Sequence, residues 1–396
     1  MGAPVKRAMP ADMPRVQTFD MLSAGQRSAM KRIARHDAAI VPQIEFSTPA
    51  EIFTSADRFE LEQEHLFRAR AIPLAISTLV AEPGTAMGHD ALGIPLIISR
   101  DKQGHVHVFL NACQHKGAKL LETCEPMKAA RMTCPYHAWT FGLDGKLLAV
   151  ARPETFMNLD KSSRNLAELP AREHGGIIWV MLNREEQPDF SPLVSELADD
   201  LEALDLPRLH VYGRKRFDIA ANWKLVLEPF LEGYHVQRLH AQTVGPMFAD
   251  VPNVVDLLGP TIRQLSGKAN FTPDDLELPG ENIHKTVTTV YNMFPNCVII
   301  TSPWYVSVML LHPRAPNHTT VEYHMLTRTV PDNPKAEELY ARSYDMILNV
   351  FGNEDFRAAE ISHAGLATGA LKTCVYSGLE ASIATYYGVL DSFLPR

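Results

Sequence analysis

Cysteine is scarce in this sequence, and basic residues are in the minority. Five cysteines are scattered over 396 residues, too few and too far apart for a framework of disulfides, so we expect a protein of the reducing cytoplasm. Lysine and arginine number 38 against 46 aspartates and glutamates, which gives a formal net charge of -8. A chain with that balance offers no basic surface to nucleic acid or to an anionic membrane, and we expect neither as a partner.

Long apolar runs and nucleotide-binding loops are also absent. No uninterrupted apolar run approaches the roughly 20 residues of a membrane-spanning helix, and residues 1–15 contain charge and proline where a signal peptide has its apolar core. The sequence has neither a Gly-x-Gly-x-x-Gly turn nor a Walker A loop, and it has too few cysteines for a second, ferredoxin-type cluster. A redox enzyme built on this chain would take its electrons from another protein.

The composition is otherwise that of a globular protein large enough for two cores, with 46% hydrophobic and 21% charged residues. Residues 1–46 read as a partly helical extension to which the sequence assigns no role. Residues 47–188 contain short β runs separated by turns, and residues 189–396 mix helices with longer strands. The clearest patterns of the last part are two strand regions at 292–311 and 319–329 and a long helix over 335–362. We therefore expect a protein made of these three parts.

Two short motifs in the second part carry metal-binding residues. Cys113 and His115 are separated by one residue, and Cys134 and His137 by two. Two thiolates and two imidazoles suit either one tetrahedral zinc or a Rieske [2Fe-2S] cluster, which places both cysteines on one iron and both histidines on the other. Structural zinc sites usually open with ligands two to four residues apart, so the tighter first motif favours iron. A hairpin over residues 95–110 would deliver Cys113 at its exit.

The surroundings of these motifs resemble the Rieske signature of the ring-hydroxylating non-haem iron oxygenases. The resemblance covers residues 111–118 (NACQHKGA) and 134–141 (CPYHAWTF). It implies one [2Fe-2S] cluster per chain, held by Cys113, His115, Cys134 and His137. The chain departs from the family in having Lys116 for the usual arginine and Ala138 for a frequent glycine. The stretch between the motifs is also slightly longer than usual, and its Cys124 is interpreted as a bystander thiol.

A second pattern lies in residues 222–240 (NWKLVLEPFLEGYHVQRLH). Two histidines and a carboxylate can hold Fe(II) on one face and leave positions open for O2 and substrate. Taken alone, His235 and His240 are better explained as surface histidines or satisfied core histidines. On an ideal helix their separation would place the side chains about 140° apart, so we predict a bulged or terminated helix between them. The segment resembles the mononuclear-iron motif of the same family, in the expected order along the chain.

The carboxylate ligand must come from another segment. The residues themselves leave Asp355, Glu354 and Glu228 as candidates, and acidic residues would also suit the first turn of a helix capped by Asn353. Residues 353–361 (NEDFRAAEI) resemble the family's late Glu-Asp segment, whose aspartate binds iron. The resemblance thus implies that Asp355 completes a mononuclear Fe(II) site, one per chain, with His235 and His240.

Glu232 occupies the position of a family residue that links the two metal sites across a subunit interface. There an acidic side chain bridges an iron-site histidine, here His235, and a cluster histidine, here His137 of the partner subunit. A solvated glutamate is the alternative from the residue type alone. Many relatives that act on aromatic rings have aspartate at this position, whereas glutamate is familiar from relatives that oxidise quaternary amines. Pro229, where many members have asparagine, is a further departure.

The resemblance also implies the fold, the partners and the reaction. We expect a β-sandwich Rieske domain and a larger α+β catalytic domain with an antiparallel sheet and helices, of the helix-grip or START-like type. Electrons would come from a separate NAD(P)H-dependent reductase, with or without a ferredoxin. The assembly would be a homotrimer of this chain, either alone or together with a beta subunit.

The substrate is expected to be small and aromatic, and to undergo hydroxylation or oxidative demethylation with O2. A betaine- or carnitine-like quaternary amine is the alternative within the class. A zinc-stabilised binding protein and a simple Rieske electron carrier are the alternatives from other classes. Five side chains are expected either to line an apolar cavity or to pack in the core of the sheet: Tyr291, Phe294, Trp304, Tyr305 and Met309.

Overall fold

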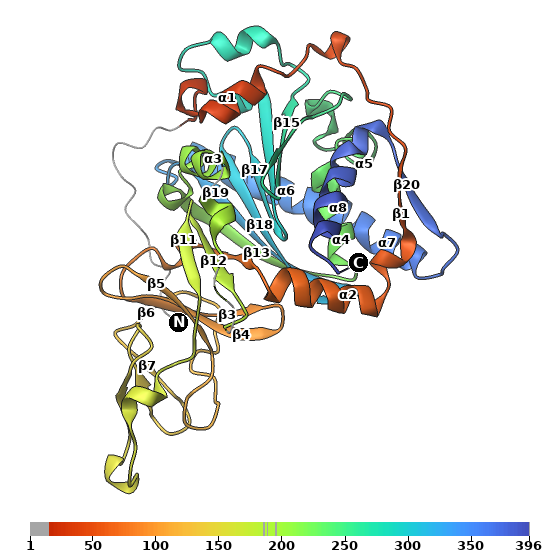
Figure 1. The fold of residues 1–396 in the computed structure, drawn as a ribbon. Helices are drawn as coiled ribbons and strands as arrows, with labels where there is room; N and C mark the ends of the chain where they lie inside the picture. The colour runs from red at the N-terminus through yellow and green to blue at the C-terminus, as the bar shows by residue number, and fades with distance from the viewer. Residues whose placement is uncertain (1–15, 185–186, 188, 195, 396) are drawn as a thin grey trace. The chain divides into compact units, whose positions relative to one another are not determined.

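The computed structural model describes residues 16–184, 187, 189–194 and 196–395, and these form two compact units (Figure 1). The first unit comprises residues 68–190, and the second comprises residues 16–67 together with the described residues from 191 onwards. The expected first boundary at residue 46/47 is therefore corrected to 67/68, because residues 47–67 pack on the second unit. Within the described residues, no helix combines the length and the apolar character needed to span a membrane.

The first unit consists of three antiparallel sheets. A five-stranded sheet has the order β10-β5-β4-β3-β6, and two three-stranded sheets have the orders β11-β12-β2 and β7-β8-β9. The strands are β2 (Ala71–Ile76), β3 (Thr85–Ala91), β4 (Ile94–Arg100), β5 (Val106–Leu110), β6 (Met127–Lys128), β7 (Met132–Thr133), β8 (Thr140–Phe141), β9 (Leu147–Ala149), β10 (Glu168–Leu169), β11 (Ala171–His174) and β12 (Ile177–Met181).

The expected hairpin that leads to Cys113 is present as β4 and β5. Arg100 pairs with Val106, and the connection turns at Gly104, whose φ of 92° favours glycine. The Asp101 carboxylate accepts the backbone N–H groups of Gln103 and His105, at 2.9 and 2.8 Å, which closes the turn. The chain therefore leaves β5 directly into the loop that contains the first Cys-x-His motif.

The second unit is organised around a seven-stranded antiparallel sheet of order β13-β19-β18-β17-β16-β15-β14. Its strands are β13 (His210–Ile219), β14 (Val254–Leu258), β15 (Thr261–Gly267), β16 (Val287–Met293), β17 (Cys297–Thr301), β18 (Tyr305–Ala315) and β19 (His318–Thr327). A separate two-stranded ladder joins β1 (Phe46–Pro49) to β20 (Thr373–Tyr376). The helices are α1 (Ala24–Met30), α2 (Ala56–Glu62), α3 (Glu196–Leu204), α4 (Trp223–Leu227), α5 (Val236–Leu239), α6 (Pro334–Asn349), α7 (Phe356–Leu366) and α8 (Ala381–Ser392).

Helices α4, α5, α7 and α8 gather on one side of this sheet (Figure 1). Strand β18, which lies between β19 and β17, is buried along nearly its whole length, as expected for a run of valine, leucine and methionine in the interior of a sheet. The strand region expected at 319–329 corresponds to β19, and the region expected at 292–311 is divided among the end of β16, β17 and the first part of β18.

The long helix expected over 335–362 is interrupted. Helix α6 begins after Asn333, whose side chain accepts the backbone N–H of Ala336, and it ends at Asn349. A π-helical turn, η14 (Val350–Asp355), separates it from α7. Asn353 lies inside this turn, so the expectation that it caps a helix is wrong. The turn leaves the Asp355 side chain buried, at 2% exposure.

A buried ion pair joins α2 to α4, the helix that precedes the second metal-binding motif. Both carboxylate oxygens of Glu62 lie within 2.8 Å of Lys224 Nζ, and both side chains are 0% exposed. Trp223 Nε1 and Arg58 Nε also donate to Glu62, at 2.8 and 2.9 Å. Burial lowers the pKa of Lys224, and the charge of Glu62 opposes that shift. Because its partners satisfy the carboxylate completely, the pair fixes α2 to α4.

Replacing Lys224 with methionine should destabilise the protein by about 3–5 kcal/mol, because it leaves a buried carboxylate without its main counter-charge. The midpoint of urea unfolding measures the loss. Adding Glu62→Gln to Lys224→Met should recover part of it. The matched control is Lys285→Met, which removes the exposed pair with Glu281 and should cost less than about 1 kcal/mol. Equal losses for the buried and exposed pairs would contradict this account.

Candidate metal centres and cavity

The two Cys/His motifs of the first unit lie on two loops of the same hydrogen-bonding pattern. The Cys113 N–H donates to Ala118 O at 2.9 Å, and the Cys134 N–H donates to Trp139 O at 2.8 Å. Each loop contains one residue in the left-handed region, Gly117 (φ 76°) and Ala138 (φ 56°). A non-glycine residue there carries some strain, which explains why glycine would suit position 138 better.

The four side chains form a thiol pair and an imidazole pair. Cys113 and Cys134 are buried at 3% exposure, and burial together with the neighbouring Cys134 raises the pKa of the Cys113 thiol. His115 Nδ1 lies 3.2 Å from His137 Nδ1, and desolvation and the proximity of His137 lower the pKa of His115. The His115 ring stacks on Trp139, with centroids 4.9 Å apart and planes 8° apart.

This donor set fits a [2Fe-2S] cluster of the Rieske type. Two buried thiols beside each other become thiolates only where a cation compensates them, and two imidazoles with their Nδ1 atoms face to face can both act as ligands. Two sulfur and two nitrogen donors in separate pairs match a cluster with differently ligated irons. The structure thus pairs Cys113 with Cys134 and His115 with His137, as such a cluster requires.

In the second unit, His235 and His240 stand at the two ends of a single helical turn. His235 directly precedes α5 (Val236–Leu239), and His240 directly follows it, with φ and ψ of -94° and 19°. Helix α5 therefore fills the interval between the two histidines without a bulge and ends at each of them, so the predicted bulge or termination is not found between the residues. Their rings lie 5.0 Å apart at 78°.

Asp355 completes the arrangement from the π-helical turn η14. Its Oδ1 atom lies 3.1 Å from His240 Nε2 and 3.5 Å from His235 Nε2, and the ligand atoms of the three residues all lie within 4.8 Å of one another. Among the described residues this buried oxygen has no hydrogen-bond partner. A buried carboxylate oxygen facing two imidazole nitrogens without a hydrogen bond is suited to a shared cation, and two histidines with one carboxylate suit Fe(II).

The opposite nitrogen of each histidine is held by a glutamate. Glu232 Oε1 lies 2.5 Å from His235 Nδ1, and Glu354 Oε2 lies 2.5 Å from His240 Nδ1. Burial opposes protonation of His240, but Asp355 and Glu354 outweigh it and raise its pKa. These contacts place the proton of each ring on Nδ1 and direct each Nε2 lone pair inward.

The sequence did not assign this role to Glu354. It was a candidate ligand, and the structure instead places it behind His240, where Thr243 Oγ1 also donates to it at 2.8 Å. The adjacency of Glu354 and Asp355 was the available signal. Its meaning depends on the π-helical turn, which sends the two carboxylates to different atoms of the same site.

A cavity of about 370 Å³ opens beside these ligands, within the second unit. Glu232, His235, His240 and Asp355 all line it, and so do Trp304 and Tyr305. The other three aromatic and methionine candidates are not among the lining residues. They are buried in the core, where Tyr291 donates a hydrogen bond to Asp200 at 2.9 Å. Apolar walls come from several elements, among them Phe230, Ile347, Val350 and Phe351.

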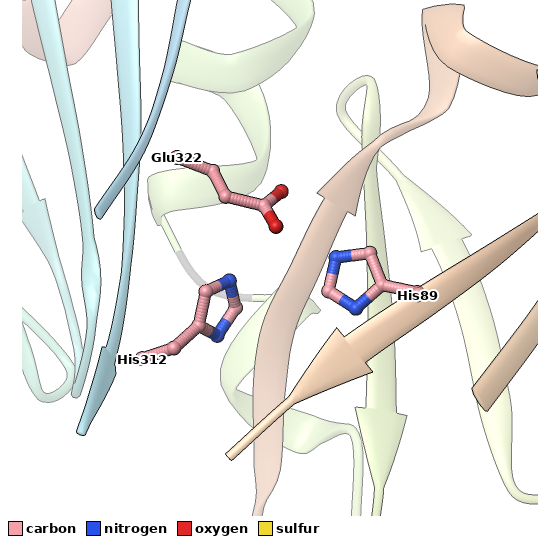
Figure 2. Close-up of side chains that lie close together, drawn as sticks. All are labelled: His89, His312 and Glu322. Carbon is pink, nitrogen blue, oxygen red and sulfur yellow. The ribbon is translucent and has the colours of Figure 1, made fainter. Parts of the chain in front are cut away.

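Another pair of potential ligands lies on the sheet of this unit. Figure 2 shows His312 of β18 and Glu322 of β19 with their side chains toward each other, and their ligand atoms are within 4.8 Å. Strand alternation puts His312 on the face of β18 opposite to Ser307, which lines the cavity. His89, also labelled there, belongs to β3 of the first unit. Since catalytic metal sites need about three protein ligands, we assign no metal to this pair.

Glu228, the remaining candidate ligand, is used elsewhere. Its Oε1 accepts the hydroxyl groups of Tyr387 at 2.8 Å and Tyr376 at 3.1 Å. Desolvation raises the pKa of Glu228 to about 7, although both hydroxyl groups favour the ionised form. The suggestion that it binds the metal is therefore wrong.

The raised pKa of Glu228 predicts a pH-dependent stability. In the folded state the carboxyl keeps its proton up to about pH 7, whereas in the unfolded chain it loses it near pH 4.5. Folding therefore takes up a proton between these values, and the contribution of Glu228 to stability falls as the pH rises through them. The difference in melting temperature between Glu228→Gln and the unmodified protein should therefore shift in favour of the variant by roughly a few degrees from pH 5 to pH 8. A difference that is constant across this range would contradict the assigned shift.

Comparison with known proteins gives matches in both units. The family model described as Rieske [2Fe-2S] domain matches residues 72–161, and the model described as ring hydroxylating alpha subunit (catalytic domain) matches residues 206–395. Choline monooxygenase of Spinacia oleracea is 26% identical, over 91% of this chain and 81% of its own length. The carnitine monooxygenase oxygenase subunit of Acinetobacter pittii is 28% identical over 56% of this chain, a match that spans only 58% of that relative.

Solved structures show the same fold. A quaternary ammonium Rieske monooxygenase in complex with L-carnitine has a TM-score of 0.75 at 21% identity, covering 91% of this chain and 99% of the other. Naphthalene 1,2-dioxygenase from Rhodococcus sp., bound to indole, has a TM-score of 0.71 at 21% identity, covering 88% and 94%. These matches confirm the expected class of fold, a Rieske domain followed by a larger α+β catalytic domain.

Proposed function

We propose that this chain, which belongs to the alpha subunits of the Rieske-type non-haem iron oxygenases, is the catalytic component of an enzyme that oxidises a small organic molecule with O2. One observation carries the proposal. The ligand atoms of His235, His240 and Asp355 lie together in the wall of a cavity of substrate size. Among the described residues, the Asp355 oxygen in this group has no hydrogen-bond partner. An electron carrier needs no such cavity, and a zinc-stabilised binding module needs no second set of ligands.

The residues divide into two ligand sets. We assign the [2Fe-2S] cluster to Cys113, His115, Cys134 and His137, and the mononuclear Fe(II) to His235, His240 and Asp355. When bound, these groups supply single-electron transfer and the activation of O2. The chain supplies geometry, because Glu232 and Glu354 hold the Nδ1 protons of the two histidines and so keep both Nε2 atoms available. The apolar walls keep water away from the ligands.

Glu232 is also our candidate for the link between subunits. Its Oε1 faces His235 Nδ1, and its Oε2 accepts the His235 backbone N–H at 3.1 Å, so the carboxylate is held in one orientation. We propose that it connects His235 to His137 of the partner subunit in a homotrimer, with or without a beta subunit. A separate NAD(P)H-dependent reductase of the cytoplasm, directly or through a ferredoxin, would be the electron source.

The cavity suits a substrate with an apolar or aromatic part. Phe230, Phe351 and Trp304 offer ring surfaces, which favours hydroxylation or oxidative demethylation of an aromatic compound. A quaternary amine is the second candidate. It is favoured by Glu232 in place of aspartate and by ring faces that can hold an alkylammonium through cation–π contact, and two relatives are named for choline and carnitine.

Metal analysis of the purified protein tests the class of function. The oxygenase should contain about three irons per chain, against about two for an electron carrier and none for a zinc module. Oxygen uptake with NADH and a reductase, across aromatic acids, uncharged aromatics and quaternary amines, then identifies the substrate class. A colourless protein that contains zinc would end the proposal.

Two pairs of variants test the ligand assignments separately. Asp355→Ala should reduce the iron content from about three to about two per chain, keep the visible absorption of the cluster and abolish oxygen uptake. Its control is Asp345→Ala, an exposed aspartate on α6, which should change none of these. Cys134→Ser should lose the visible absorption, whereas the exposed Cys124→Ser should keep it. Full activity in Asp355→Ala would show that the triad is assigned wrongly.

A further inference from the structure

One lysine lines the cavity beside the candidate iron ligands. Lys268 follows β15, and its backbone N–H donates to Thr286 O at 2.8 Å. The side chain is 9% exposed and belongs to the cavity wall. Its position is therefore fixed by the end of a sheet strand, which is a rigid support for a binding group.

This ammonium group is buried without a counter-charge. In the described part of the chain its one hydrogen bond is to His284 O, at 2.7 Å, although an ammonium group has three N–H donors. No ion pair involves it there, and the two carboxylates of the cavity wall, Glu232 and Asp355, are already engaged with His235 and His240. Burial alone lowers the pKa of Lys268, to about 8, so the group still carries its proton at pH 7.

Burying a cation without a counter-charge is strongly unfavourable. We therefore expect a bound group to compensate the charge of such a residue. The neighbouring polar side chains on the same face of the sheet do not need such a partner. Gln264 donates to Phe230 O and accepts from Ser382, and Ser266 donates to Asn253. Among these residues Lys268 is the one charged group, and two of its three N–H donors have no partner in the described part of the chain.

We propose that Lys268 anchors the carboxylate of the substrate, so that this oxygenase acts on small organic acids. The inference rests on the function proposed above and narrows it. Aromatic acids and zwitterionic quaternary amino acids both satisfy it, because each combines a carboxylate with a part that fits the apolar and aromatic walls. Uncharged aromatic hydrocarbons and cationic amino alcohols do not, since neither compensates the lysine. The charge of the substrate, more than its ring or its ammonium group, is what this cavity selects.

Binding to the iron-loaded enzyme in the absence of reductase tests the anchor without turnover. Isothermal titration calorimetry compares benzoate with benzamide and glycine betaine with choline, since each pair differs mainly in the carboxylate. At least one carboxylate should bind 10-fold or more tightly than its partner. Lys268→Met should abolish that ratio, and Lys268→Arg, which keeps the charge, should retain most of it. The control is Lys285→Met, whose side chain is exposed and should leave the ratio unchanged.

The ratio separates anchoring from a structural role. If Lys268 served only to hold His284, Lys268→Met would weaken both members of a pair equally and leave their ratio as it was. That result, or a failure of every carboxylate to bind better than its partner, overturns the anchor. A protein with three irons per chain and no carboxylate preference would retain the proposed function and lose this inference. A colourless protein that contains zinc would overturn the proposed function and this inference with it, whereas activity in Asp355→Ala would overturn only the ligand triad.

Discussion

The structure of the second unit depends on bringing three metal-ligand atoms together from segments that are far apart in the sequence. Asp355 lies more than a hundred residues from His235 and His240, and regular helices would bring none of them into position. Helix α5 is confined to one turn, and the helix that contains Asp355 opens into a π-helical turn. Both irregularities are held in place by carboxylates, Glu232 and Glu354, which bind the outward nitrogens of the two imidazoles. Charge-assisted hydrogen bonds around the site thus accompany the loss of helical regularity within it.

The rest of the unit surrounds these ligand atoms with apolar side chains and supports them on regular elements. The sheet forms one side of the cavity, and α6 and η14 contribute further lining residues. Behind the site, the Glu62 and Lys224 pair ties the N-terminal segment to the helix that precedes the histidine motif. A buried pair of this kind adds little net stability compared with apolar packing, but it tolerates only one geometry. The unit therefore uses charge twice, for fixing α2 to α4 and for orienting the ligands.

Much of the site followed from the sequence, because short motifs are local. The spacing of Cys113, His115, Cys134 and His137 needs only two tight loops, and those loops are visible in the glycine and proline content around them. Helical geometry indicated an irregularity near His235 and His240, but the helix ends at each of these residues and not between them. Three features could not be predicted from local motifs: the contact of Glu354 with His240, the direction of the Asp355 side chain, and the lack of a counter-charge at Lys268. Each depends on a partner far away in the chain or on a helix that departs from 3.6 residues per turn. The first domain boundary failed for the same reason, since the pairing of β1 with β20 joins residues more than 300 positions apart.

The π-helical turn at Val350–Asp355 has a consequence for how such a site can arise or be lost in evolution. A π turn accommodates one residue more than the α-helix around it, so an insertion of one amino acid is enough to create it. The reverse change, deletion of a single residue between 350 and 354, would restore a continuous α-helix and remove the widened turn from which Glu354 and Asp355 reach different atoms of the site. Homologues shorter by one residue in this segment would retain the Glu-Asp pair in their sequence and lack the turn that separates the two carboxylates. For this family of folds, the length of the segment is as informative as the identity of its residues.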